Sequence, residues 1–211
     1  KKENPKRFLE KFGFFQKKRA NGKLIWFHCS SVGELLSIAP LIERFEKDID
    51  IKSILISTST LSSSKIFEKF KFKKTIHQFY PIDNPLIVNK FLCYWKPAAV
   101  FFVESEIWPE MLRGLKRKKI KTFLLNARIS KNSFYRWKYF KDFGVSVFGI
   151  FDYIFPQNRE TFNYLKHFKV KKMKILGNLK FSESKRISAN KFIKISFLKR
   201  KILCAASTHN N

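Results

Sequence analysis

The sequence predicts an α/β fold built on a doubly wound, mostly parallel, Rossmann-like sheet. Strand-like apolar runs alternate with helix-like periodic segments along the chain, with short connections and no internal repeat or low-complexity linker. The run AAVFFV at residues 98–103 is continuously apolar, as is typical of a central parallel strand that is buried on both faces. Repeated strand-helix alternation with right-handed crossovers produces a parallel sheet.

The first unit, residues 24–45, shows the pattern most clearly. Residues 24–27 are predicted to form a strand, a turn with Ser30, Ser31 and Gly33 follows, and apolar residues then recur at helical spacing over residues 35–45. The N-terminus of such a helix presents free backbone N–H groups at the sheet edge and favours anions. Glu34 lies there, and it is either a capping residue or a base held where a substrate binds.

The remaining elements follow in order. Strands are predicted at residues 51–57, 75–80, 98–103, 121–125, 153–155, 173–176 and 202–205, and helices at residues 62–70, 83–94, 107–118, 133–148, 159–167 and 191–199. Pro85 and Pro109 suit the first turns of their helices, and Gly177 ends the seventh strand.

Composition limits the size of the core and the class of partner. The 211 residues, 45% of them hydrophobic, can bury one good-sized core or one domain and the edge of another. A formal charge of +28, from 44 Lys and Arg against 16 Asp and Glu, favours polyanionic partners such as nucleic acid, anionic lipid or phosphorylated substrates. The basic clusters are spread along the chain, and no RNP-type strand or recognition helix occurs. A basic α/β module that binds nucleic acid or an anionic surface is therefore kept as an alternative hypothesis for the function.

The cysteines, histidines and N-terminal residues bear on metal binding, on the cellular compartment and on contact with a membrane. Cys29, Cys93 and Cys204 lack paired metal-ligand spacing, so we expect reduced, buried thiols in a cytosolic compartment. The four histidines form no metal-binding pattern, and no apolar run approaches the roughly 20 residues of a membrane span. The basic, Phe-rich residues 1–15 either lie on an anionic membrane surface or pack on the domain as a lead-in helix.

Polar residues follow the predicted strands, where parallel sheets bind their ligands. They are Glu34, the hydroxyl-rich loop 57–64, Asp83, Glu104, Ser105, Glu106, Asn126, Arg128, Asn178 and Lys180. In extended backbone Glu104 and Glu106 face the same side, so they are candidates for a like-charge pair with one raised pKa; helix capping is the plainer interpretation. Lys180 is one of many lysines, and only its convergence with the others on one rim makes it a candidate.

Six short blocks resemble, in order, the signature blocks of the Kdo (3-deoxy-D-manno-octulosonic acid) transferase family. They are SSVGE at residues 30–34, FYPID at 79–83, VESEIWP at 103–109, NARIS at 126–130, GNLKF at 177–181 and ASTH at 206–209. The resemblance runs from about Pro5 to His209, and the six blocks together are specific although each alone is not.

The resemblance implies the N-terminal, acceptor-side half of a GT-B glycosyltransferase of lipopolysaccharide biosynthesis. Residues 1–22 would be a lead-in segment, 23–185 the acceptor-side domain, and 186–211 a linker helix and the first strand of a truncated donor domain. The family implies CMP-Kdo as donor, a lipid A precursor as acceptor, inversion at the sugar, and no metal, cofactor or nucleic acid. It also implies the cytoplasmic face of the bacterial inner membrane, with peripheral attachment or an anchor outside this chain. We expect the fragment alone to be inactive, and a transferase for another nucleotide sugar is the alternative with the same fold.

The resemblance also assigns roles to residues. Glu34 would be the proton acceptor, and Glu104 and Lys180 would stabilise the transition state. Substrate contacts would come from Ser30, Ser31, Gly33, Thr60, Ser62, Ser64, Glu106, Asn126, Arg128 and Asn178. Leu61 and Ser63 stand where the family usually has Pro and Gly, which leaves Thr60, Ser62 and Ser64 for phosphate contacts. A helix N-terminus lowers a carboxylate's pKa, so Glu34 would be a weaker base there than burial alone would make it.

Overall fold

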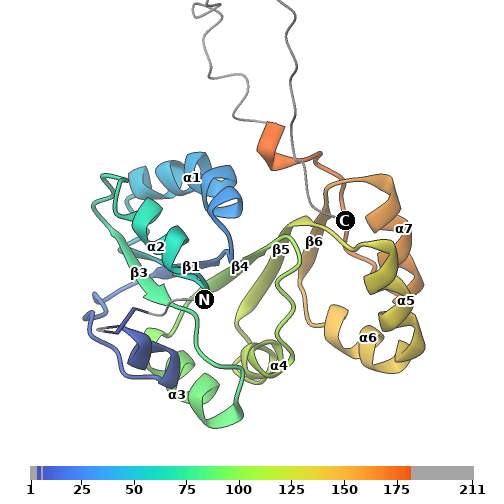
Figure 1. The fold of residues 1–211 in the computed structure, drawn as a ribbon, viewed down its shortest axis with the longest axis horizontal. Helices are drawn as coiled ribbons and strands as arrows, with labels where there is room; N and C mark the ends of the chain where they lie inside the picture. The colour runs from blue at the N-terminus through green and yellow to red at the C-terminus, as the bar shows by residue number, and fades with distance from the viewer. Residues whose placement is uncertain (1–3, 6, 182–211) are drawn as a thin grey trace, which may run out of the picture.

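A six-stranded parallel sheet forms the centre of the protein, in a computed structural model that describes residues 4–5 and 7–181 (Figure 1). The strands are β1 (Leu24–His28), β2 (Ser53–Thr58), β3 (Thr75–Phe79), β4 (Ala99–Val103), β5 (Lys121–Ala127) and β6 (Tyr153–Pro156). Their order is β3-β2-β1-β4-β5-β6, and every neighbouring pair is parallel. The predicted doubly wound α/β fold is confirmed.

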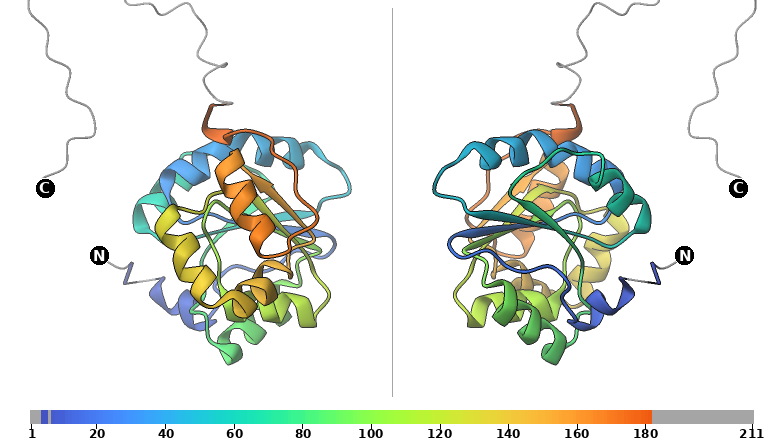
Figure 2. Two further views of the ribbon diagram at one scale, coloured as in Figure 1. Left: turned by 90° about the vertical axis from the view of Figure 1, so that its right-hand side faces the viewer. Right: turned by 90° about the vertical axis from the view of Figure 1, so that its left-hand side faces the viewer.

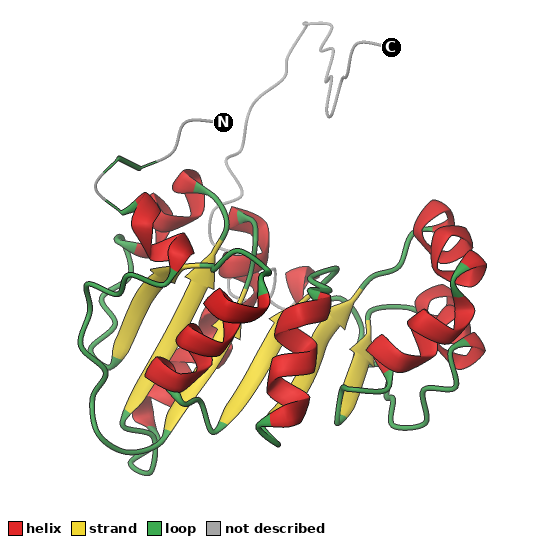
Figure 3. Cartoon of the chain, turned by 90° about the horizontal axis from the view of Figure 1, so that it is seen from below, coloured by secondary structure: helices red, strands yellow, loops and turns green. Residues whose placement is uncertain are grey.

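Helices lie above and below the sheet, as the two side views in Figure 2 show. One face carries α1 (Val32–Lys47) and α2 (Leu61–Phe67), and the opposite face carries α3 (Pro85–Trp95) and α4 (Pro109–Arg117). The view from below in Figure 3 has the helices of that second face in front of the strands. The remaining helices are α5 (Lys131–Tyr139), α6 (Lys141–Phe148), α7 (Arg159–His167) and the short 3₁₀ helices η1 (Phe8–Phe12) and η2 (Leu179–Phe181).

Strand β1 is apolar over its first four residues because both of its faces are covered. Leu24 and Trp26 belong to the hydrophobic cluster on the side of α3 and α4, whereas Ile25 and Phe27 belong to the cluster under α1. Successive side chains of a strand point to opposite faces, so this alternation requires helices on both sides.

The order of the strands reverses between β1 and β4. From β1 the chain proceeds through β2 to β3 at one edge, and it then crosses back to β4 and continues to β6 at the other edge. The helices that follow β1 and β4 therefore leave the sheet in opposite directions, and the crevice between the two strand ends is the usual ligand position in such a sheet.

The N-terminal segment packs on the edge strand β3. Arg7 donates hydrogen bonds to both carboxylate oxygens of Glu10, at 2.6 and 3.0 Å, and to the backbone oxygen of His77 at 3.0 Å. The Glu10 carboxylate also accepts the backbone N–H of Phe79 at 2.9 Å. The segment is packed on the domain as one of the two predictions had it, and Phe8, Leu9, Phe12 and Phe14 stay exposed.

The single helix predicted for residues 133–148 is wrong, because α5 and α6 are separate helices with a break at Phe140 (φ −105°, ψ 54°). The break brings the rings of Trp137 and Phe148 to a centroid distance of 5.2 Å. In one straight helix these residues would be about 16 Å apart along the axis. Tertiary packing of the aromatic side chains therefore overrides a locally continuous helical pattern.

Two other predictions are corrected. Residues 173–176 form no strand: Met173 makes an isolated parallel bridge with Ile154, and the chain then leaves the sheet. Cys93 is exposed on α3 rather than buried, whereas Cys29 is buried as expected. The helix and strand predicted at 191–199 and 202–205, and Cys204, lie outside the described residues.

Candidate functional site

Glu34 lies in the first turn of α1, directly after the end of β1. The Ser31 hydroxyl accepts the Glu34 backbone N–H at 3.3 Å and donates to Glu34 Oε1 at 2.8 Å. Glu34 Oε2 accepts the backbone N–H of Ser30 at 2.7 Å. These contacts form a capping box, so capping is confirmed as one role of Glu34, and its catalytic role stays a prediction.

The surroundings of Glu34 raise its pKa. Burial is the largest cause, and the nearby carboxylates Glu106 and Glu104 add to it. Hydrogen bonds from Ser30 and Ser31 lower the pKa without cancelling the rise. Burial therefore outweighs the effect of the helix N-terminus that we expected to weaken this base. A carboxylate with a raised pKa accepts a proton more readily than an exposed one.

Three segments converge on Glu104 at the end of β4. Its Oε1 accepts hydrogen bonds from Lys180 Nζ at 2.7 Å and from Asn126 Nδ2 at 3.4 Å. The Asn126 amide also donates to Asn178 Oδ1 at 3.3 Å and accepts the Leu179 backbone N–H at 3.1 Å. Glu104, Asn126, Asn178 and Lys180 thus form one hydrogen-bonded cluster, which includes two of the three predicted catalytic residues, Glu104 and Lys180.

The backbone at two strand ends turns these side chains toward the rim. Glu104 and Asn126 adopt left-handed conformations with φ of 62° and 52°. The register between β5 and β6 also shifts between Leu124 and Ala127, next to Asn126, and such irregularities redirect side chains. The start of α1 lies against the same cluster, because a Cβ added to Gly33 would be 3.7 Å from Lys180 Cε.

Glu106 is held by a different set of partners. His28 Nε2 donates to Glu106 Oε2 at 3.0 Å, and Trp108 Nε1 donates to the same oxygen at 2.8 Å. Burial alone would raise the pKa of Glu106, but the hydrogen bonds from His28, Trp108 and Ser30 lower it overall. The hypothesis of a like-charge pair between Glu104 and Glu106 is therefore wrong: each carboxylate has its own donors, and the raised pKa belongs to Glu34.

His28 is the main residue of this site that the sequence analysis missed. It is fully buried, and its Nδ1 lies 3.0 Å from the Ser57 hydroxyl, which accepts the Trp26 indole N–H at 2.8 Å. The same Nδ1 lies 3.1 Å from the Ser57 backbone oxygen, so His28 joins the end of β2 to Glu106 beside the end of β4. The available signal was a polar residue in the otherwise apolar run of β1.

Asp83 has a structural role. Its two carboxylate oxygens accept the backbone N–H groups of Glu110 at 3.0 Å and Met111 at 2.8 Å. It therefore caps α4, a function that sequence spacing alone would have assigned to Glu106.

The hydroxyl-rich loop closes over the end of β1. Thr60 caps α2 by accepting the Ser63 backbone N–H at 3.2 Å, and the Ser63 hydroxyl donates to the Ser30 backbone oxygen at 3.2 Å. Ser62 is exposed, whereas Ser64 is buried and its hydroxyl is poorly placed for the predicted phosphate contact. Ser63, which the sequence analysis passed over, is the residue that ties this loop to the site.

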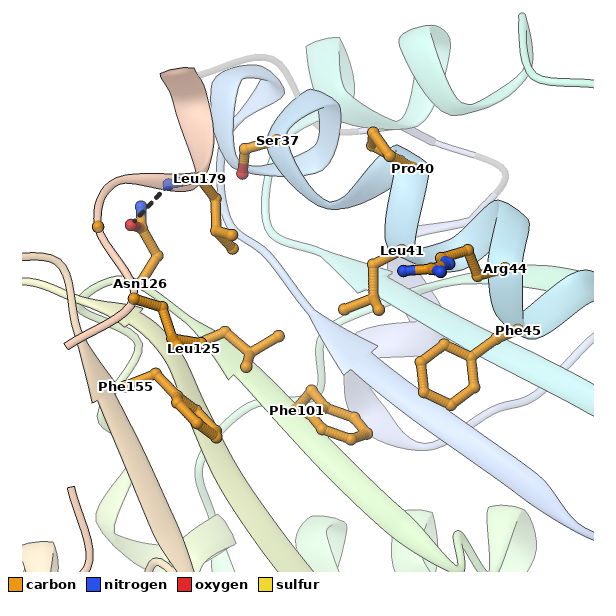
Figure 4. A pocket seen from close by; sticks show the side chains of 12 residues that line it. Ser37, Pro40, Leu41, Arg44, Phe45, Phe101, Leu125, Asn126, Phe155 and Leu179 are labelled. Carbon is orange, nitrogen blue, oxygen red and sulfur yellow. Dashed lines mark hydrogen bonds between the residues drawn. The ribbon is translucent and has the colours of Figure 1, made fainter. Parts of the chain in front are cut away.

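Two cavities of similar size flank the Glu104 cluster. A polar cavity of about 390 Å³ lies over the ends of β5 and β6 and is lined by Glu104, Arg128, Asn178 and Lys180 together with the first residues of α5 and α7. An apolar groove of about 410 Å³ lies where Leu41 and Phe45 of α1 face Phe101 and Phe155 of the sheet (Figure 4). Asn126 lines this groove, and its hydrogen-bond partners Glu104 and Asn178 line the polar cavity.

Over residues 4–5 and 7–181, no three His, Cys, Asp or Glu side chains come together in a way that would hold a metal ion. In the same part of the chain, no helix has the length and apolar character needed to cross a membrane.

Solved structures of low sequence identity share this fold. The UDP-GlcNAc 2-epimerase of Neisseria meningitidis, solved with UDP-GlcNAc, aligns with a TM-score of 0.56 and 13% identity over 80% of this chain and 51% of its own. The UDP-N-acetylglucosamine 2-epimerase of Rickettsia bellii aligns with a TM-score of 0.56 and 16% identity over 79% and 47%. The fold is thus the Rossmann-like half of a GT-B architecture.

Sequence relatives are more specific. A 3-deoxy-D-manno-octulosonic acid transferase of Rickettsia bellii is 33% identical over 99% of this chain and 50% of its own length, and that of Haemophilus influenzae is 27% identical over 97% and 49%. A probable mitochondrial 3-deoxy-D-manno-octulosonic acid transferase of Arabidopsis thaliana is 37% identical over 62% and 29%. The chain spans about half the length, or less, of these relatives. The family model described as 3-deoxy-D-manno-octulosonic-acid transferase (kdotransferase) matches residues 6–183, and the chain therefore belongs to this family.

Proposed function

We propose that this chain is the acceptor-side half of an enzyme that transfers Kdo from CMP-Kdo to a lipid A precursor with inversion. The observation that carries the proposal is the position of Glu34. It is a buried carboxylate with a raised pKa at the crevice between β1 and β4, next to the Glu104–Lys180 pair. Family membership supports the same reaction class.

In the proposed reaction Glu34 removes the proton from the acceptor hydroxyl as that hydroxyl attacks the anomeric carbon. Charge then separates between an oxocarbenium-like sugar and a departing CMP phosphate. The Glu104 carboxylate suits the cationic sugar, and the Lys180 ammonium suits the phosphate. Ser30, Ser31, Gly33, Thr60 and Ser62 border the acceptor side of the crevice. This chemistry uses no metal or cofactor.

The test is Glu34→Gln in a full-length transferase that contains this half. Glutamine keeps one oxygen that accepts the Ser30 N–H, and its NH₂ group donates to the Ser31 hydroxyl instead of accepting from it. It does not take up the proton, so turnover at saturating acceptor should fall about 10²- to 10⁴-fold while acceptor binding changes little. Glu68→Gln, at an exposed carboxylate after α2, is the control. A stable Glu34→Gln protein with wild-type turnover would remove Glu34 from the mechanism.

Residues 1–211 by themselves should not transfer Kdo. They span about half of the related transferases, and positioning of both substrates contributes roughly 7 to 11 kcal/mol to lowering a barrier. Detectable transfer by this chain alone would contradict the proposal.

We also propose that this half works at the cytoplasmic face of the bacterial inner membrane. Phe8, Phe12 and Phe14 are exposed, and the Lys90 ammonium lies 4.3 Å from the centre of the Phe14 ring. Apolar and cationic groups together favour an anionic membrane surface, where the charge attraction is screened over about 8 Å at physiological salt. Binding to vesicles with anionic lipid should therefore weaken steeply as salt rises. Equal binding to neutral vesicles at high salt would count against this location.

A further inference from the structure

The polar cavity over the ends of β5 and β6 shares a wall with the proposed catalytic cluster. Glu104, Asn178 and Lys180 line it from one side, and the first residues of α5 and α7 line it from the other. Its volume of about 390 Å³ lies in the range of small-molecule sites, so it has room for more than a single ion. A sugar held at Glu104 and Lys180 would extend into this space.

The cations of the cavity differ in their partners. Lys180 is paired with Glu104 at 2.7 Å. Arg128 and Lys131 also line the cavity, and their side chains form no hydrogen bond or ion pair within residues 4–5 and 7–181. The second acid of the cavity, Glu160, accepts the Tyr164 hydroxyl at 2.7 Å and is exposed. Within the described part of the chain, these two cations therefore have no side-chain partner and face the cavity that a ligand would occupy.

We propose that Arg128 and Lys131 form a subsite for an anionic group, a carboxylate or a phosphate, carried by one of the two sugars that meet at Glu104 and Lys180. The planar guanidinium of Arg128 suits two oxygens of such a group, and Lys131 adds a point charge. Ser130 caps the Ser133 N–H, and the N–H groups of Lys131 and Asn132, which have no acceptor within α5, add to the same preference. The identity of the two sugars rests on the proposed function. The binding of an anionic group at Arg128 and Lys131 does not.

The experiment is a titration of the 211-residue chain, followed through the NMR signals of Arg128 and Lys131 at about physiological salt. The probes are free Kdo, which carries a carboxylate, glucosamine 6-phosphate, which carries a phosphate, and uncharged N-acetylglucosamine. We expect saturable shifts with at least one anionic sugar and none with N-acetylglucosamine. Tighter binding of Kdo assigns the subsite to the donor sugar, and tighter binding of the phosphosugar assigns it to the acceptor.

The variants separate a built subsite from general attraction to a basic protein. Arg128→Gln with Lys131→Gln should weaken binding about tenfold or more, because both charge-assisted contacts are lost. Lys138→Gln, in the last turn of the same helix, removes the same kind of charge away from the cavity and should bind as the wild type does. Unchanged melting temperatures show that the variants are folded.

The proposal is overturned if neither anionic sugar saturates the signals, or if Lys138→Gln weakens binding as much as the double variant does. Failure of the proposed function has a different signature. In that case the anionic sugars would still bind at Arg128 and Lys131, while a full-length transferase that contains this half would show no Kdo transfer.

Discussion

Glu10 and Glu34 are both buried carboxylates, and their surroundings are opposite. Glu10 is 1% exposed and pairs with Arg7 through two hydrogen bonds at the β3 edge. Glu34 is 7% exposed, accepts hydrogen bonds only from neutral donors, and has no ion pair with a cation in the described part of the chain. A buried carboxylate that is paired with a cation can anchor a segment of the chain, whereas a buried carboxylate without a cationic partner has a raised pKa. Burial alone therefore does not identify a functional carboxylate. The charge of its hydrogen-bond partners distinguishes the two cases.

The largest expected effect separates the two residues by stability. Glu10→Gln leaves the Arg7 charge without its anion and should lower the free energy of unfolding by about 3 kcal/mol. Glu34→Gln keeps the contact to the Ser30 N–H and reverses the hydrogen bond with Ser31, so it should change that free energy by no more than about 1 kcal/mol. Urea unfolding of the 211-residue chain measures both. The interpretation of the two carboxylates is contradicted if Glu34→Gln proves less stable than Glu10→Gln.

A second effect is a pH dependence at the Glu10 anchor. Burial, with the neighbouring Arg7 charge, lowers the pKa of His77 from 6.5 to about 3. The unfolded chain therefore binds a proton first as pH falls, so stability is lost below pH 6.5 and down to about pH 3. Between pH 6.5 and 5 this loss is about 1.5 kcal/mol for His77. His77→Gln should make the measured decline over that interval shallower, and an unchanged slope would contradict the assignment.

A third, smaller effect sharpens the description of Glu34. Removing the negative charge of Glu106 favours ionisation of its neighbour, so Glu106→Gln should lower the pKa of Glu34. If Glu34 is the base, activity requires its ionised form, and the acid limb of the activity profile should then move to lower pH. A ¹³C carboxyl NMR titration follows the pKa directly. Glu160→Gln, on the same rim but not among the groups that shift Glu34, should leave the titration in place.

The sequence predicted the fold because its binary pattern is local, and each strand and helix is recognisable from its own residues. The rim positions of Glu34 and Glu104 also followed from the pattern, since parallel strands end at one edge. Lys180 reaches the same rim without the strand that was predicted before it at residues 173–176. The hydrogen-bond partners of the site residues did not follow from the pattern. The contact between His28 and Glu106 joins residues of β1 and the end of β4, and this juxtaposition exists only once the strand order is known. The break at Phe140 likewise depends on packing between helices rather than on a local signal.

The left-handed backbone at Glu104 and Asn126 has a consequence for the way this domain can be improved. A left-handed conformation costs a residue such as Glu104 about 1 kcal/mol relative to glycine, whereas asparagine tolerates it better. Glycine at either position would relieve that cost but would remove the carboxylate that pairs with Lys180 or the amide that binds Glu104, Asn178 and Leu179. Thermostable descendants should therefore keep both residues and carry their stabilising changes away from the rim.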